Sequence, residues 1–142
     1  MINLKKIIFI FLIFLLNFES LQAGIKDSIY ITIGNKPVTK SDIKDEIKII
    51  LILNGEKFSE DKKNKLQKSA IEALIKRNVK KIELEKNSFL EINQDDLKLE
   101  VSRLARSINV NTETFKKICE ANGINFELVI DNIKTELLWN SL

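Results

Sequence analysis

Residues 29–55, IYITIGNKPVTKSDIKDEIKIILILNG, carry the pattern that decides the fold of this 142-residue chain. Isoleucine alternates with tyrosine and threonine over residues 29–33. This alternation predicts one short β-strand, because successive side chains of a strand point to opposite faces. Gly34, Asn35 and Pro37 then predict a turn. We predict no second strand, so this one is expected to lack a partner within the sequence.

A helix is predicted directly after the turn. Thr39 can cap it, with Asp42 three residues further on, and Asn54 followed by Gly55 supplies a left-handed stop. The expected apolar stripe is Ile43, Ile47, Ile50 and Leu51.

Four more helices are predicted downstream, each with its own cap or stop. The expected boundaries are Ser59 to about residue 87, a start at Asn93, a short helix ending at Asn122 and Gly123, and a start at Asn125. Their apolar stripes are Leu66, Ala70, Ala73, Leu74 and Ile82; Leu97, Val101, Leu104 and Ile108; Phe115 and Ile118; and Val129, Ile133 and Leu137. Helices with short links must bury these stripes against one another. The predicted fold is therefore mostly α: one small bundle of about five helices with one short N-terminal β-strand.

The first 23 residues, MINLKKIIFIFLIFLLNFESLQA, have the order of a secretory signal peptide. Lys5 and Lys6 precede a ten-residue apolar run, and a more polar stretch ends at Ala23. The alternative is an uncleaved membrane anchor, but a spanning helix needs about 20 apolar residues. We therefore expect cleavage after Ala23, a periplasmic domain over residues 24–142, and no stable membrane anchor after cleavage.

Composition excludes several kinds of chemistry. The chain has no histidine, which removes Ser-His-Asp and Cys-His catalysis and histidine-containing zinc sites. Its single cysteine, Cys119, cannot form an internal disulfide, and its helical position favours half-buried packing over a reactive thiol. No phosphate loop, metal-ligand spacing or nucleophile motif occurs. We predict no catalytic residues, no cofactor and no metal site.

Charged clusters have structural explanations. The basic runs are Lys62, Lys63, Lys65 and Lys68, then Lys76, Arg77, Lys80 and Lys81. Acidic residues are interleaved and the net charge is only +3, so solvated helix faces are predicted rather than nucleic-acid binding. The acidic pairs Glu60-Asp61 and Asp95-Asp96 fall in first turns of predicted helices, where the helix dipole favours them.

Three stretches in this order resemble the N-terminal domain of the SurA family of periplasmic chaperones. They are residues 29–55, residues 69–97 (SAIEALIKRNVKKIELEKNSFLEINQDDL) and residues 114–142 (TFKKICEANGINFELVIDNIKTELLWNSL). The likeness covers nearly all of the chain after the leader. Related helical modules occur in foldases of the PpiD and PrsA types.

The resemblance implies a module that holds unfolded outer-membrane proteins, or other exported polypeptides, without ATP. Apolar grooves between helices would bind these clients, although the sequence does not identify which residues do so. Family members usually continue into parvulin prolyl-isomerase domains, and a C-terminal segment packs back on the N-terminal module. The chain is therefore expected to be a fragment of a longer protein, whose C-terminal segment would pair with the strand.

Two other functions stay open at this point. The chain could be the non-catalytic part of a longer parvulin-type peptidyl-prolyl isomerase, in which case the residues present here would have no isomerase activity. It could also be an envelope adaptor whose apolar stripes meet one fixed partner.

Overall fold

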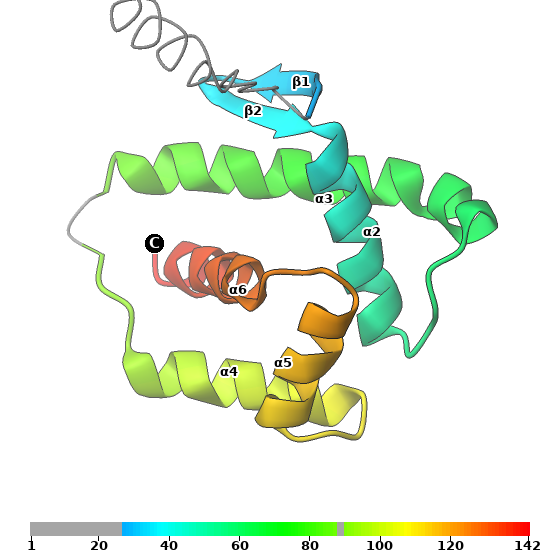
Figure 1. Ribbon diagram of the computed structural model, residues 1–142. Helices are drawn as coiled ribbons and strands as arrows, with labels where there is room; N and C mark the ends of the chain where they lie inside the picture. The colour runs from blue at the N-terminus through cyan, green and yellow to red at the C-terminus, as the bar shows by residue number, and fades with distance from the viewer. Residues whose placement is uncertain (1–26, 88–89) are drawn as a thin grey trace, which may run out of the picture.

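The computed structural model describes residues 27–87 and 90–142, so the predicted signal peptide lies outside the described residues. The elements are β1 (Ile29–Ile33), β2 (Lys36–Thr39), α2 (Lys40–Leu53), α3 (Glu60–Glu85), α4 (Gln94–Ser107), α5 (Thr112–Ala121) and α6 (Phe126–Asn140). The predicted fold class is confirmed, because the described part is a small helical bundle with a short β element (Figure 1). None of the helices described here has the length and apolar character needed to cross a membrane.

The prediction of a strand without a partner was wrong. β1 pairs with β2 in an antiparallel hairpin, in which Ile33 lies opposite Lys36 across the two-residue turn Gly34-Asn35. Pro37 lies inside β2 rather than in the turn. A two-stranded sheet tolerates it because an edge strand does not need every backbone N–H. β2 was not predicted from the sequence because its four residues include a proline and show no alternation of apolar residues. Val38 is its single buried side chain.

Gly34 holds the hairpin against α3. Its φ of +58° lies in the region that favours glycine, as the first central residue of a two-residue hairpin turn often requires. A Cβ atom at this position would lie 2.9 Å from Cδ1 of Ile82 on α3. Turn geometry and close approach to α3 therefore both favour glycine here.

The predicted helix starts are confirmed. At α2, the backbone N–H of Asp42 donates to Thr39 Oγ1 (3.1 Å), and the Thr39 N–H donates to Asp42 Oδ2 (2.7 Å). Ser59, Asn93 and Asn125 cap α3, α4 and α6 in the same general way. These caps satisfy backbone donors that a helix start leaves without partners.

α2 is buried on two faces, whereas the sequence predicted one stripe. Its last turns read IKIILIL, in which Lys48 is the single polar residue, so apolar side chains lie on more than one face. One face packs with β2 and α3 in a cluster of Val38, Ile43, Ile47, Leu51 and Ala70. The other face adds Ile49 and Ile52 to a second cluster, with Leu97, Val101, Ala105, Phe115, Cys119, Ile124, Val129 and Ile133. α2 therefore belongs to both cores and joins them.

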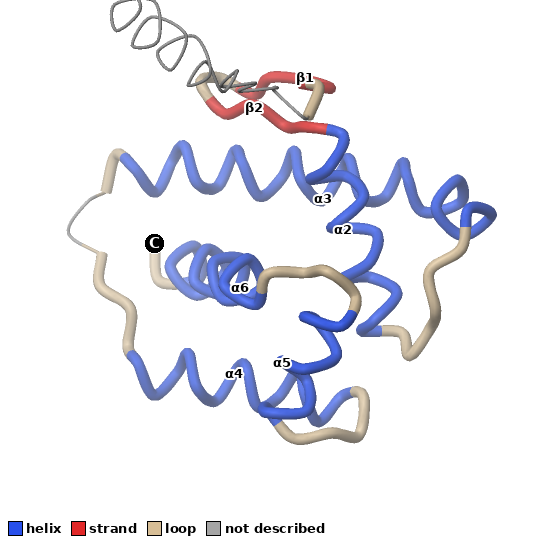
Figure 2. The backbone as a smooth tube through the Cα atoms, in the orientation of Figure 1, coloured by secondary structure: helices blue, strands red, loops and turns tan. Residues whose placement is uncertain are grey.

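α2, α3, α4 and α5 lie around α6 (Figure 1). α6 contacts both α3 and α4, which run along opposite sides of it (Figure 1). α2 and α5 lie at one end of this arrangement, and the hairpin lies on the side of α3 away from α4 (Figure 2).

Candidate binding groove

A groove with a cavity volume of about 370 Å³ lies where α2, α3, α4 and α6 meet. We call it the central groove. Its apolar lining consists of Ile49, Ile50, Leu53, Leu104, Val129, Ile133 and Leu137, and its polar lining consists of Glu46, Arg77, Glu100, Arg103, Asn132, Glu136 and Asn140. Apolar residues from three helices thus share the groove with charges of both signs and two amide side chains.

The spacing of apolar residues on α6 explains part of this lining. Val129, Ile133 and Leu137 follow one another at intervals of four, so they share one face of the helix. Val129 and Ile133 are buried and Leu137 is half-buried. The stripe that the sequence predicted on this helix is therefore partly core and partly groove wall.

A buried ion pair borders the groove. The Arg77 guanidinium on α3 donates to both carboxylate oxygens of Glu46 on α2, over 2.7 and 3.0 Å. Only 16% of the Arg77 side chain and 6% of the Glu46 side chain are exposed. The prediction that Arg77 belongs to a solvated helix face was wrong. Its partner is 31 residues away in the sequence, beyond the range of a pattern along one helix.

A second, exposed ion pair lies on the α4 side of the groove. Arg103 Nε donates to Glu100 Oε2 over 2.8 Å. This hydrogen bond from the Arg103 side chain, together with its charge, lowers the pKa of the Glu100 carboxyl below its ordinary value. Glu100 therefore stays ionised at neutral pH, and the groove keeps both signs of charge.

Three lysines of the first predicted basic run are confirmed as surface charges and form ion pairs. Lys62, Lys63 and Lys65 form ion pairs with Glu56, Glu60 and Asp61. The acidic pairs lie in the first turns of α3 and α4, as predicted. Within residues 27–87 and 90–142, no three histidine, cysteine, aspartate or glutamate side chains come together in a way that could hold a metal ion.

Lys80, in the second basic run, links α3 to α6. It pairs with Glu136, and its Nζ lies 5.7 Å from the centroid of the Trp139 ring. The carboxylate of Glu136 thus binds Lys80 at the border of the central groove. A cation over an indole face adds a second attraction between the two helices.

Cys119 lies in the core rather than in the groove. It is fully buried in the cluster with Phe115 and Ile124, more deeply than the half-buried position that we predicted. Desolvation raises the pKa of its thiol to about 11. Since the thiolate is the nucleophile, Cys119 has almost no reactive form at neutral pH.

We expect native Cys119 to resist alkylation by iodoacetamide at pH 8 and to react readily once urea unfolds the chain. Because the folded-state pKa is the higher one, folding favours the protonated thiol, and stability should fall as pH rises from about 9 towards 11. Mass spectrometry after timed labelling measures the first effect, and urea titrations at pH 8 and 10.5 measure the second. A Cys119→Ser variant should lose the part of the pH dependence that comes from the thiol. Rapid labelling of the native chain at pH 8 would contradict this account.

Sequence reasoning predicted grooves between helices but not the residues that line them. The groove needs side chains from four helices whose contacts are long-range. Ile50, Leu104 and the α6 residues belong to predicted apolar stripes, but no pattern along one helix shows that these stripes meet. Comparison with known proteins adds no further guide: no family model matches this chain, and no curated protein matches it.

Proposed function

We propose that this chain is a periplasmic chaperone module. It binds unfolded outer-membrane protein segments, and other exported polypeptides, in the central groove and without ATP. The observation that carries the proposal is a partly apolar groove, open to solvent and formed by four helices. The sequence resemblance to the SurA family and the signal-peptide pattern of residues 1–23 support the periplasmic setting.

The lining chemistry suits an extended chain of varied sequence. Apolar side chains from Leu53, Leu104 and Leu137 can contact a client's apolar residues without demanding one shape. Asn132 and Asn140 each offer a donor and an acceptor to a client's backbone. The rim charges, Glu46, Arg77, Glu100 and Arg103, are already paired with each other, so they do not require a particular client charge. Such a site binds modestly and broadly, which a holding chaperone needs.

The proposal assigns no catalytic step to this chain. The sequence has no histidine to act as a general base, and its single cysteine is buried and protonated, so it is a poor nucleophile. If the chain belongs to a longer prolyl isomerase, its part there would be to hold the client. The other alternative, an adaptor for one folded partner, predicts strong preference for that partner over unfolded chains.

The test is suppression of aggregation when a urea-unfolded outer-membrane β-barrel protein is diluted into buffer with the full chain. A Leu104→Ser/Leu137→Ser variant should bind the unfolded barrel protein at least about tenfold more weakly. Tenfold corresponds to about 1.4 kcal/mol, which is the loss of about 60 Å² of apolar contact. Light scattering follows aggregation, and fluorescence anisotropy of the labelled barrel protein gives the affinity.

A matched control removes apolar side chains outside the groove. Leu99 on α4 and Val79 on α3 are 61% and 50% exposed and do not line the groove. Leu99→Ser/Val79→Ser should keep full activity. Circular dichroism of both variants shows whether the helices remain. Equal activity of a folded groove variant and the control would overturn the central groove as the client site.

A further inference from the structure

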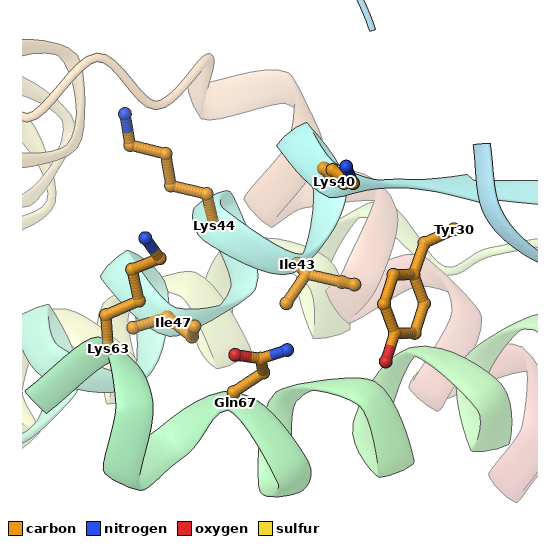
Figure 3. Close-up of a pocket in the computed structure, with 7 residues that line it drawn as sticks. All are labelled: Tyr30, Lys40, Ile43, Lys44, Ile47, Lys63 and Gln67. Atoms are coloured by element: carbon orange, nitrogen blue, oxygen red, sulfur yellow. The ribbon is translucent and has the colours of Figure 1, made fainter. Parts of the chain in front are cut away.

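A second hollow lies between the hairpin, α2 and α3, on the other side of α2 from the central groove. We call it the lysine pocket; its cavity volume is about 280 Å³. Figure 3 shows Ile43 and Ile47 of α2 inside it, with Tyr30 of β1 at one end. Lys44 and Lys63 lie towards the opposite end, and Gln67 of α3 lies between these two lysines and Tyr30.

A break in the hairpin register accompanies the placement of Tyr30. Ile29 pairs with Thr39 and Ile31 pairs with Val38, which makes Tyr30 the extra residue of a β-bulge. Bulges change the direction in which a strand side chain points. Tyr30 is 47% exposed and lines the pocket.

The charges of the lysine pocket have one sign. Its lining contains Lys40, Lys44 and Lys63 and no acidic residue. Lys63 pairs with Glu60 over 2.8 Å, but neither Lys40 nor Lys44 forms an ion pair with any of the described residues. Many other lysines on these helices do pair, as Lys48, Lys62 and Lys65 show. Lys44 Nζ lies 6.0 Å from the centroid of the Phe58 ring, but no carboxylate of the described residues pairs with Lys40 or Lys44. Positive charge is therefore concentrated beside an apolar floor.

The pocket continues into a longer hollow along α3. An adjoining cavity shares Tyr30 and Gln67 with the lysine pocket and adds Asn64, Lys68, Ile71 and one acidic residue, Glu72. Lys68, like Lys40 and Lys44, lacks an ion pair among the described residues. The two hollows together offer apolar contacts, amides, three ammonium groups without ion pairs among the described residues, and the single carboxylate of Glu72. Two adjoining hollows that share Tyr30 and Gln67 suit an extended chain better than a small ion.

We propose that the lysine pocket docks an acidic segment of an extended polypeptide. The segment places one apolar side chain against Ile43, Ile47 and Tyr30, and its carboxylates against Lys40 and Lys44. The nature of the partner rests on the proposed function, which supplies unfolded polypeptide, and the pocket adds a preference for acidic, apolar stretches of it. Charge complementarity favours this occupant, because carboxylates provide the negative charge that the lining lacks.

A membrane surface is the less favoured partner. Binding to anionic lipid uses basic residues around an apolar face that can enter the interface. Here the apolar residues Ile43 and Ile47 are buried at the bottom of a hollow, where a flat lipid surface cannot reach them. A single side chain that protrudes from a peptide can reach these two residues.

The test uses the full chain and two capped fluorescent peptides, Gly-Ser-Asp-Phe-Asp-Ser-Gly and its twin with asparagine in place of both aspartates. Fluorescence anisotropy should show the aspartate peptide binding about tenfold more tightly, the effect expected of one charge-assisted hydrogen bond. The difference in affinity between the two peptides should largely disappear at 1 M salt, where the Debye screening length is about 3 Å. Lys40→Gln/Lys44→Gln should abolish the difference.

The matched control is Lys57→Gln/Lys76→Gln, which removes the same charge from lysines outside both hollows and outside the ion pairs of the described residues. It should keep the tenfold preference. Equal binding of the two peptides, or an unchanged preference in Lys40→Gln/Lys44→Gln, would overturn the proposal. Binding to phosphatidylglycerol vesicles that needs Lys40 and Lys44, with no binding of either peptide, would overturn it in favour of a membrane.

The outcome is separable from that of the central groove. Leu104→Ser/Leu137→Ser should leave the aspartate preference intact, because neither residue lines the lysine pocket. If the unfolded barrel protein binds normally to Lys40→Gln/Lys44→Gln and the peptides show no preference, the lysine pocket fails while the proposed function stands. If the chain prefers the aspartate peptide but does not bind the unfolded barrel protein, the proposed function fails while the lysine pocket stands.

Discussion

Replacing Arg77 with methionine is expected to lower the free energy of unfolding by about 3–5 kcal/mol, the usual cost of removing one partner from a buried ion pair. The replacement leaves the Glu46 carboxylate buried between α2 and α3 without the guanidinium that binds both of its oxygens. A domain of this size has a total stability of about 5–15 kcal/mol, so the loss is a large part of it. Urea denaturation followed by circular dichroism measures the change.

Two comparisons separate a buried-charge effect from a loss of packing. A Glu46→Met/Arg77→Met variant removes both charges, and its stability should return to near that of the parent or exceed it. Arg103→Met breaks the exposed pair with Glu100 and should cost less than about 1 kcal/mol. If Arg77→Met and the double variant were equally unstable, the charge account would be wrong, and the arginine stem would be the stabilising part.

One hydrogen-bond donor of the Arg77 guanidinium has no partner in this ion pair. This donor, Nε, is buried and has no partner among the described residues, although both terminal nitrogens bind Glu46. A buried donor without a partner costs roughly 1–3 kcal/mol. The pair therefore contributes less net stability than its geometry suggests, which is one more reason to expect the double methionine variant to fold well.

Local signals along the sequence were enough to predict the helices. Thr39, Ser59, Asn93 and Asn125 are capping residues, and Asn54-Gly55 and Asn122-Gly123 end α2 and α5 as expected. Each of these signals acts within a few residues, because a cap bonds backbone groups of its own first or last turn. Boundaries that depend on such contacts can be read without knowing the fold.

Long-range partners could not be predicted in the same way. β2 was missed because Pro37 is a turn signal in most contexts and is tolerated here only at the edge of a two-stranded sheet. The second buried face of α2 was missed because Ile49 and Ile52 need α4, α5 and α6 to cover them. Arg77 looked like one more surface charge until Glu46 was placed beside it.

The candidate sites show the same limit. Leu137 and Ile133 were predicted as part of a helix stripe, but only the packing of α6 between α3 and α4 makes them groove lining. Lys40 and Lys44 carry no sequence signal at all, since lysine is common along the whole chain. Their interest arises because the hairpin brings Tyr30 next to them and no acidic residue neutralises them.

Truncating Phe115 to alanine is expected to cost about 3–5 kcal/mol, as large-to-small changes of buried aromatic residues do. Phe115 is the largest fully buried side chain, and its ring meets Phe126 edge to face with centroids 5.7 Å apart. The cavity would open at the centre of the cluster that joins α4, α5 and α6 to α2. With a loss of about 4 °C per kcal/mol, the melting temperature should fall by at least about 12 °C.

Phe58→Ala provides the matched control, because Phe58 is only half-buried and packs against the other core cluster. It should cost clearly less than Phe115→Ala. Unfolding of the Phe115→Ala variant should still give the same midpoint by circular dichroism and by Trp139 fluorescence, because α2 contributes side chains to both clusters and couples them. Separate midpoints would show that the α4–α6 part melts first and that α2 does not couple the two cores. The four helices around the central groove would then not be held as one unit, and client binding should be lost with the first transition.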